Sequence, residues 1–202
     1  MLHPRGDAQL VQIRDRVLLE RTDTALADAA NRAGEWLACR PGCTQCCHGA
    51  FAINALDVAR LRAAVHAADP GTAQTLRARA QLWIDRYGPD FPGDPQAGVL
   101  GTSDEDQARF DDFANDAACP ALNPATGLCD IYAGRPMTCR VFGPPTRPAE
   151  SDALGCCELC FIGASEEQIA ACEMPVDHQE EERLLAALGD RRETVVAFAL
   201  LG

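Results

Sequence analysis

The sequence predicts an all-α protein, in which helices form a scaffold and irregular cysteine-rich loops run between them. Apolar residues recur at the three- and four-residue spacing of helices over most of the chain. No alternating strand pattern continues beyond four residues. The 202 residues include 11 cysteines, most of which lie where the helical periodicity fails. These observations favour a helical fold whose loops are organised by their cysteines.

The first helix is expected over residues 7–37, with Asp7 as its N-cap. Leu10, Ile13 and Val17 fall on one face of this helix, because residues three and four apart lie side by side. Val11, Leu18 and Ala25 lie beside that face. We expect the helix to end where the first cysteines begin.

Two further helices follow, over 55–68 and 73–87. Asn54 is the expected cap of the former, and Thr72 is expected to start the latter after a break at Pro70 and Gly71. Their expected core positions are Leu56, Leu61, Val65, Leu76, Trp83 and Tyr87.

The middle of the chain is less regular. Residues 88–101 are rich in glycine and proline and are expected to form a loop. Ser103 and Asp106 have the spacing of a capping box for a short helix that runs to Asn115. Residues 119–160 combine recurrent cysteine, proline and glycine with weak periodicity, so they are expected to be irregular.

Three short helices are expected after these loops. Each follows a side chain that can accept hydrogen bonds from the first helical turn. The expected starts are Ser165 with Gln168, Asp177 with Glu180 for a helix over 178–188, and Asp190 for an apolar helix over 193–200.

Composition favours a protein of the cytosol. The N-terminal residues carry charges throughout, unlike a signal peptide, and no apolar run approaches the ~18 residues of a membrane span. Thiols stay reduced in the cytosol, so clustered cysteines indicate metal ligands or redox groups. The net charge is −12 and the 18 basic residues are all arginine with no basic patch, which argues against nucleic-acid binding.

The first cysteine cluster has the pattern C-x3-C-x2-C-C and consists of Cys39, Cys43, Cys46 and Cys47. Spacings of three and four bring side chains to one face of a turn or helix. The side chains of adjacent residues diverge in most backbone conformations, so Cys46 and Cys47 are expected to serve two metals or a polynuclear cluster.

Two later groups complete the candidate ligands. The middle cysteines are ten residues apart, as suits ligands on loops, and the late group includes the C-x2-C spacing common in zinc and iron–sulfur sites. The middle group is Cys119, Cys129 and Cys139; the late group is Cys156, Cys157 and Cys160; and Cys172 stands apart.

The sequence resembles the YkgJ-like family of cysteine-cluster proteins, described as zinc- or iron-chelating, which carry the same C-x3-C-x2-C-C signature. Beyond the first cluster, the resemblance rests on Cys119-Pro and on the string C-x-I-Y-x2-R-P-x2-C-R-x-F, which runs from Cys129 to Phe142. It covers about residues 36–145. The family often carries another cysteine after this string, for which the late group offers the candidates. A similar motif occurs in flagellin lysine methylases.

With this resemblance, the chain 1–202 is interpreted as a single domain. A cysteine-cluster core at 36–145 would contain a helical insertion at 55–115, and residues 146–202 would add the late cysteines and the C-terminal helices.

Thiolates suit zinc, iron–sulfur clusters or Cu(I). The expected ligands are Cys39, Cys43, Cys46, Cys47, Cys119, Cys129, Cys139, Cys156, Cys157 and Cys160. His48 is expected to support the site or face solvent rather than to bind metal. Arg135 and Arg140 are expected either to donate hydrogen bonds to thiolate sulfur or to form surface ion pairs.

The leading interpretation is a cytosolic metal-binding protein with zinc or iron in a multi-cysteine, polynuclear site, for storage, delivery, sensing or maturation. One alternative is an iron–sulfur redox protein or oxidoreductase. Another is an accessory module that assists a methylase-like system through a protein partner. Metal ions are the expected partners, and neither nucleic acid nor membrane is. No familiar catalytic motif is present, and the sequence leaves the question of catalysis open.

Overall fold

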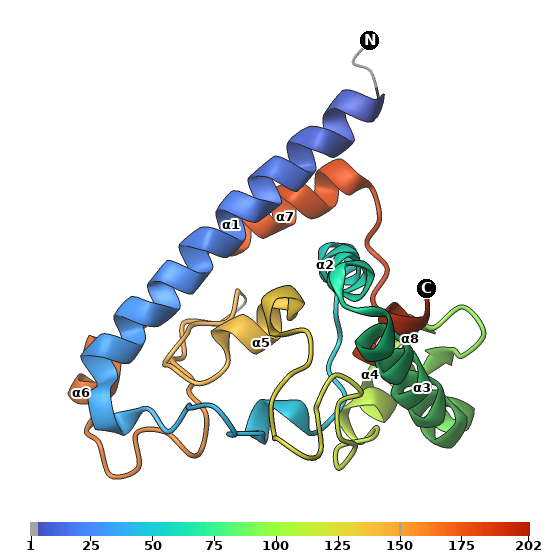
Figure 1. Ribbon diagram of the computed structural model, residues 1–202. Coiled ribbons are helices and arrows are strands. Elements are labelled where there is room, and N and C mark those ends of the chain that lie inside the picture. The colour runs from blue at the N-terminus through green and yellow to red at the C-terminus, as the bar shows by residue number, and fades with distance from the viewer. Residues whose placement is uncertain (1–3, 150) are drawn as a thin grey trace. The chain divides into compact units, whose positions relative to one another are not determined.

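The computed structural model describes residues 4–149 and 151–202 and is mainly α-helical, which confirms the predicted fold class (Figure 1). The helices are α1 (Pro4–Ala33), α2 (Ala55–Ala67), α3 (Pro70–Tyr87), α4 (Asp104–Asp111), α5 (Met137–Val141), α6 (Glu166–Ala171), α7 (His178–Leu188) and α8 (Val196–Leu201). The strands β1 (Gly93–Asp94) and β2 (Val99–Leu100) form one antiparallel hairpin. Among the described residues, no helix is both long and apolar enough to cross a membrane.

The chain divides into two compact units. Unit 1 consists of Met1–Arg40 and Met137–Gly189, and unit 2 consists of Pro41–Pro136 and Asp190–Gly202. The interpretation of 1–202 as one domain stays a prediction.

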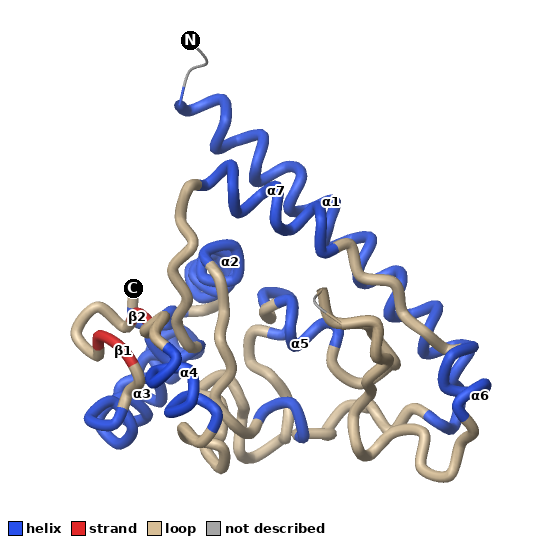
Figure 2. Tube along the Cα trace, turned by 180° about the vertical axis from the view of Figure 1, so that it is seen from behind, coloured by secondary structure: helices blue, strands red, loops and turns tan. Residues whose placement is uncertain are grey.

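Unit 1 is built on the long helix α1, against which α7 packs (Figures 1 and 2). The buried stripe of α1 includes Val11, Leu18 and Ala29, and Leu184 of α7 is fully buried. The helix already begins at Pro4, a residue suited to the first turn, so the expected cap at Asp7 is wrong.

The apolar face expected on α1 is buried only in part. Val11 and Leu18 are buried, whereas Leu10, Ile13 and Val17 are 53%, 52% and 40% exposed. The helix α7 packs against α1, so its position decides which apolar residues of α1 are covered.

Unit 2 is built from α2, α3 and α8, because both longer helices pack against α8. Its apolar core includes Leu61, Val65, Leu76 and Leu200. The predicted cap of α2 is confirmed, since the side-chain oxygen of Asn54 accepts hydrogen bonds from two amides of the first turn. The expected core positions Leu56, Leu61, Val65, Leu76 and Trp83 are buried, and Tyr87 is half-buried against Trp83.

Two predicted helix starts are wrong. The helix α3 begins at Pro70 and not after it, because proline fits the first helical position and Asp69 caps the helix by accepting from the Thr72 amide at 3.0 Å. The helix α8 has no side-chain cap, since the Asp190 carboxylate accepts from Arg192 instead.

The remaining caps behave as predicted. Ser103 caps α4, although this helix ends at Asp111 rather than Asn115. Ser165 forms the expected capping box with Gln168, and Asp177 caps α7. The loop expected at 88–101 contains the short hairpin of β1 and β2.

The loop that carries two middle cysteines packs tightly on α2 at Gly134. A Cβ atom at this position would lie 2.3 Å from Ala64 Cβ and 3.0 Å from the Arg60 carbonyl oxygen. Gly134 ends a single 3-10 turn, Tyr132–Gly134, directly before Arg135. The absence of a side chain therefore sets how closely this segment approaches the helix.

Replacement of Gly134 by alanine should lower the free energy of unfolding by about 1–3 kcal/mol, because α2 and the turn must separate to admit the methyl group. Urea unfolding followed by circular dichroism measures the change. Gly155→Ala is the matched control, since a Cβ there meets no atom within 4 Å. Equal stability of the two variants would contradict the close packing.

Candidate metal centre

The cysteines are distributed over both units. Unit 2 holds Cys43, Cys46, Cys47, Cys119 and Cys129. Unit 1 holds Cys39, Cys139, Cys156, Cys157, Cys160 and Cys172. All eleven are free thiols.

In unit 2, backbone hydrogen bonds join the first and middle cysteine segments. Cys46 and Cys47 lie on a 3-10 turn, Gln45–Cys47, and the Cys119 amide donates to the Cys47 carbonyl oxygen at 2.8 Å. The Gly49 amide donates to Ala117 at 2.9 Å, so the two segments run antiparallel beside each other. This pairing brings residues 72 positions apart in the sequence into direct backbone contact.

Cys119 and Cys129 lie on the two arms of one hairpin-like loop. Leu122 pairs with Cys129, and the Asp130 amide donates to Ala121 at 2.9 Å. Both cysteines pack against the apolar core of unit 2. The ten-residue spacing noted in the sequence is therefore the length of a loop that folds back on itself.

The thiols of these segments are electrostatically coupled. A hydrogen bond from the Cys47 thiol, aided by Arg135, lowers the pKa of Cys46 to about 6. Donation of that bond raises the pKa of Cys47, as do burial and the charges of Cys46, Cys119 and Cys129. Burial raises the pKa of Cys119 to about 11 and also raises the pKa of Cys129. The metal-free cluster therefore holds one thiolate and three thiols at neutral pH.

The expected divergence of Cys46 and Cys47 is wrong. The two side chains share a hydrogen bond, so they point toward each other from the 3-10 turn. Adjacent side chains in a 3-10 turn are about 120° apart around its axis, less than the ~180° of a strand, so the two sulfur atoms can approach each other.

The two arginines expected near sulfur differ. Arg135 is buried, its guanidinium lies 3.8 Å from the centroid of the Tyr132 ring, and its charge lowers the pKa of Cys46 and favours the charged form of Cys129. Arg140, in unit 1, instead donates to the Asp23 carboxylate at 2.7 Å. The Nδ1 atom of His48 lies 3.0 Å from the Thr44 carbonyl oxygen.

The late cysteines form a separate buried group in unit 1. Cys157, Cys160 and Cys172 belong to one apolar cluster with Ala33 and Phe161. The Cys160 amide donates to Cys157 at 2.8 Å, which closes the C-x2-C segment into a turn. Cys172, which stands apart in the sequence, is therefore close to this group in the fold.

Cys39 of unit 1 also lies near this group. The Cys157 amide donates to the Gly143 carbonyl oxygen at 3.2 Å, and a Cβ on Gly143 would lie 2.5 Å from Cys39 Sγ. Cys139 lies on α5, and Cys156 is exposed to solvent.

The donor chemistry of these groups fits zinc or iron, which prefer thiolate ligands. Within residues 4–149 and 151–202, however, no three His, Cys, Asp or Glu side chains are arranged to hold a metal ion. The backbone brings Cys46, Cys47, Cys119 and Cys129 together, and metal binding requires their side chains to reorient from hydrogen-bonded thiols into ligands.

The residue that sequence reasoning missed is Arg79 of α3, which binds the loop between Cys119 and Cys129. The sequence contained one signal for the role of Arg79. Arg79 follows Leu76 by three residues and precedes Trp83 by four, so a charged side chain lies on the buried side of this helix.

In metal-free protein at pH 7.5, iodoacetamide should modify Cys46 at least ~10-fold faster than Cys119, because the thiolate is the reacting form. The rate at Cys46 should rise with a midpoint near pH 6, the pKa of that thiol. Mass mapping of modified peptides gives the rates. Cys47→Ala removes the hydrogen bond and should move the midpoint toward 9, the ordinary pKa of a cysteine thiol. A midpoint near 9 in the unaltered protein would refute the coupling.

Comparison with known proteins agrees with the cysteine arrangement. The model of the CxxCxxCC family, described as "Putative zinc- or iron-chelating domain", matches residues 38–160, more than half of the chain. This match spans all three cysteine groups and confirms the resemblance expected from the sequence. No curated protein and no solved structure matches the chain. The chain belongs to the CxxCxxCC family of zinc- or iron-chelating domains.

Proposed function

We propose that this chain is a cytosolic metal-handling protein that binds zinc or iron through a polynuclear thiolate site centred on unit 2. The observation that carries the proposal is the backbone pairing that joins the segments bearing Cys46, Cys47, Cys119 and Cys129. The effect of these thiols on one another's pKa agrees with this placement. The family description supports the choice of zinc or iron.

The thiol inventory supports more than one metal ion. Unit 2 contains five cysteines, one more than a tetrahedral zinc ion requires. Unit 1 contributes a further group, in which Cys157 and Cys160 have the spacing of a metal-binding turn. Within this proposal, Cys43 is a further ligand in unit 2, beside the central four. Unit 1 has its own ligands, which are Cys39, Cys139, Cys156, Cys157 and Cys160.

The exposure of the central thiols favours storage, delivery or sensing over a purely structural role. Cys46 and Cys47 are half-buried, so solvent and a competing ligand can reach them. The bound cation replaces protons on Cys47, Cys119 and Cys129, whose pKa values are raised, so loading releases protons and weakens as the pH falls. Acidification or a competing chelator therefore promotes release.

Protein purified without air or chelator should contain more than one zinc or iron ion per chain by native mass spectrometry and elemental analysis. Cys119→Ala should lower this number, because it removes a central ligand, whereas Cys172→Ala should leave it unchanged. A single ion per chain contradicts a polynuclear site, and no bound metal contradicts the proposed function. A brown protein with charge-transfer absorption would identify the metal as an iron–sulfur cluster, and a colourless one with bound zinc would exclude that cluster.

Removal of the metal should lower the thermal midpoint by about 10 °C. A ligand present at about 1,000 times its dissociation constant contributes about 4 kcal/mol, and each kcal/mol shifts the midpoint of a chain of this size by about 2–4 °C. Differential scanning calorimetry before and after chelation, followed by reloading with zinc, measures the shift. An unchanged midpoint would show that metal binding and folding are independent in this chain.

A further inference from the structure

We propose that Arg79 positions Cys119 and Cys129 for metal binding, an inference that rests on the proposed function. Arg79 belongs to α3, far from every cysteine motif in the sequence. The contacts that Arg79 makes give this helix a specific task, which is to hold the loop that bears the two cysteines.

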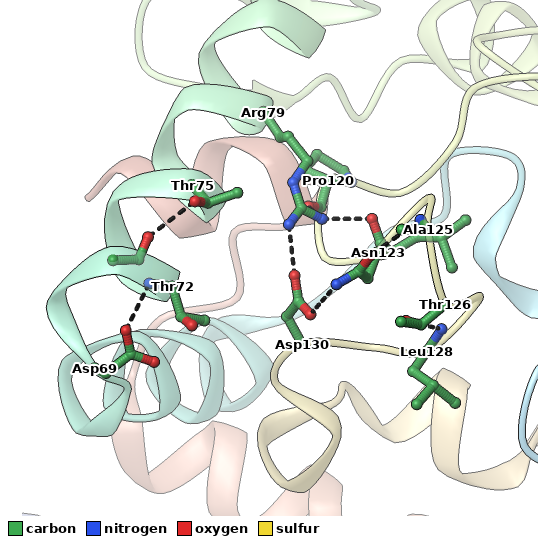
Figure 3. A network of polar contacts seen from close by, with 12 residues as sticks. Asp69, Thr72, Thr75, Arg79, Pro120, Asn123, Ala125, Thr126, Leu128 and Asp130 are labelled. Carbon is green, nitrogen blue, oxygen red and sulfur yellow. Dashed lines mark hydrogen bonds and ion pairs between the residues drawn. The ribbon is translucent and has the colours of Figure 1, made fainter.

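The guanidinium of Arg79 binds both arms of that loop. Its Nη1 donates to the carbonyl oxygens of Pro120 at 3.2 Å and Leu122 at 2.5 Å. Its Nη2 donates to Asp130 Oδ2 at 2.5 Å (Figure 3). Pro120 directly follows Cys119, and Asp130 directly follows Cys129. One rigid planar group therefore sets the distance between the backbone segments that carry the two thiols.

The same carboxylate also closes the tip of the loop. Asn123 Nδ2 donates to Asp130 Oδ1 at 3.1 Å, opposite the oxygen that Arg79 uses (Figure 3). The Asn123 amide donates to Leu128 at 2.8 Å, and its side-chain oxygen accepts from the Ala125 amide. Both ends and the tip of the loop thus converge on the Arg79–Asp130 pair.

The Arg79–Asp130 ion pair is largely shielded from solvent. The side chains of Arg79 and Asp130 are 22% and 19% exposed, so solvent screens their attraction less than it screens a surface ion pair. Arg79 lies on α3 beside Leu76 and Ala80, whose full burial anchors the helix in the core. A charge-assisted contact on a rigid helix restricts the loop more than a contact between two mobile side chains.

Apolar contacts and Arg79 have different roles in the loop. Ala121 and Ile131 already attach it to the core of unit 2, so the loop keeps its place without the arginine. The hydrogen bonds of Arg79 hold the two arms of the loop at a fixed position relative to each other. Metal ligation depends on this relative position, because thiolate positions must agree with the coordination geometry to within about 0.2 Å. Arg79 acts through Pro120, Leu122 and Asp130 and is a positioning residue.

Arg79→Gln in the full chain should weaken zinc binding about 10–100-fold, measured by competition with a chromophoric chelator, as is typical when support for metal ligands is removed. The Co²⁺-loaded variant should show altered d–d and sulfur-to-metal bands, which a change in stability alone would not move. Arg79→Lys keeps the charge but not the fork that binds three acceptors, so it should recover only part of the affinity. Arg77→Gln, on the exposed side of α3, is the control and should match the unaltered protein.

An unchanged zinc affinity and Co²⁺ spectrum in Arg79→Gln would overturn the assignment of Arg79 while leaving metal binding itself intact. Absence of zinc and Co²⁺ binding in the unaltered protein would overturn both proposals. If Arg79→Gln loses its helical circular dichroism, Asp130→Asn decides, because it weakens the same contact and keeps the size of the side chain. Faster alkylation of Cys119 in metal-free Asp130→Asn than in the unaltered protein, with Cys157 and Cys160 unchanged, supports the assignment. An unchanged rate at Cys119 refutes it. Cys129 is left out of this comparison, because the Asp130 charge itself raises the pKa of Cys129.

Discussion

The hydrogen bond from the Cys119 amide to the Cys47 carbonyl oxygen joins the two cysteine-bearing segments of unit 2. Together with the hydrogen bond from the Gly49 amide to Ala117, this contact fixes the turn at Cys46–Cys47 beside the loop at Cys119–Cys129. In this arrangement, four thiols influence one another's ionisation. The rest of unit 2 is arranged around this junction. The hairpin-like loop packs on the apolar core, Gly134 admits it closely to α2, and Arg79 ties both of its arms to α3.

This arrangement explains why a cysteine-rich segment of weak periodicity has a defined structure. Residues 119–135 contain little regular secondary structure and contribute few large apolar side chains. Their order comes from elements outside the segment. The helices α2 and α3 supply the apolar surface, and Arg79 satisfies carbonyl groups that neither helix nor strand would pair. The helices α2 and α3 are thus the scaffold of the cysteine loop.

Local signals predicted this fold well, and contacts between distant residues account for the errors. Asn54, Ser165 and Asp177 cap their helices as expected, because a cap depends only on the next three residues. The start of α3 was predicted wrongly at Pro70, because proline can either end a helix or begin one. Only the hydrogen bond to the Asp69 side chain shows that Pro70 begins this helix.

Contacts between residues far apart in the sequence could not be predicted from the local pattern of residues. The stripe of α1 that becomes buried depends on α7, about 170 residues later, so the apolar spacing of Leu10, Ile13 and Val17 could not decide it. The cysteine groups were visible from spacing alone. The direction in which the Cys46 and Cys47 side chains point was not visible from the spacing, since it follows from a single 3-10 turn.

The ionisation of the cluster links its structure to metal exchange. One thiolate at Cys46 is stabilised by its neighbour's proton and by Arg135, and its charge in turn opposes ionisation of Cys47, Cys119 and Cys129. Further negative charge in this partly buried place is costly unless a cation enters with it. Under the proposed function, a divalent metal would supply that charge and displace the remaining protons, so protons and metal would compete for the same sulfur atoms. Arg135 would not join this competition, because a guanidinium keeps its proton throughout the accessible pH range. Cys46, already ionised beside Arg135, would then bind the metal first, and the cost of deprotonating the other three thiols would lower the affinity.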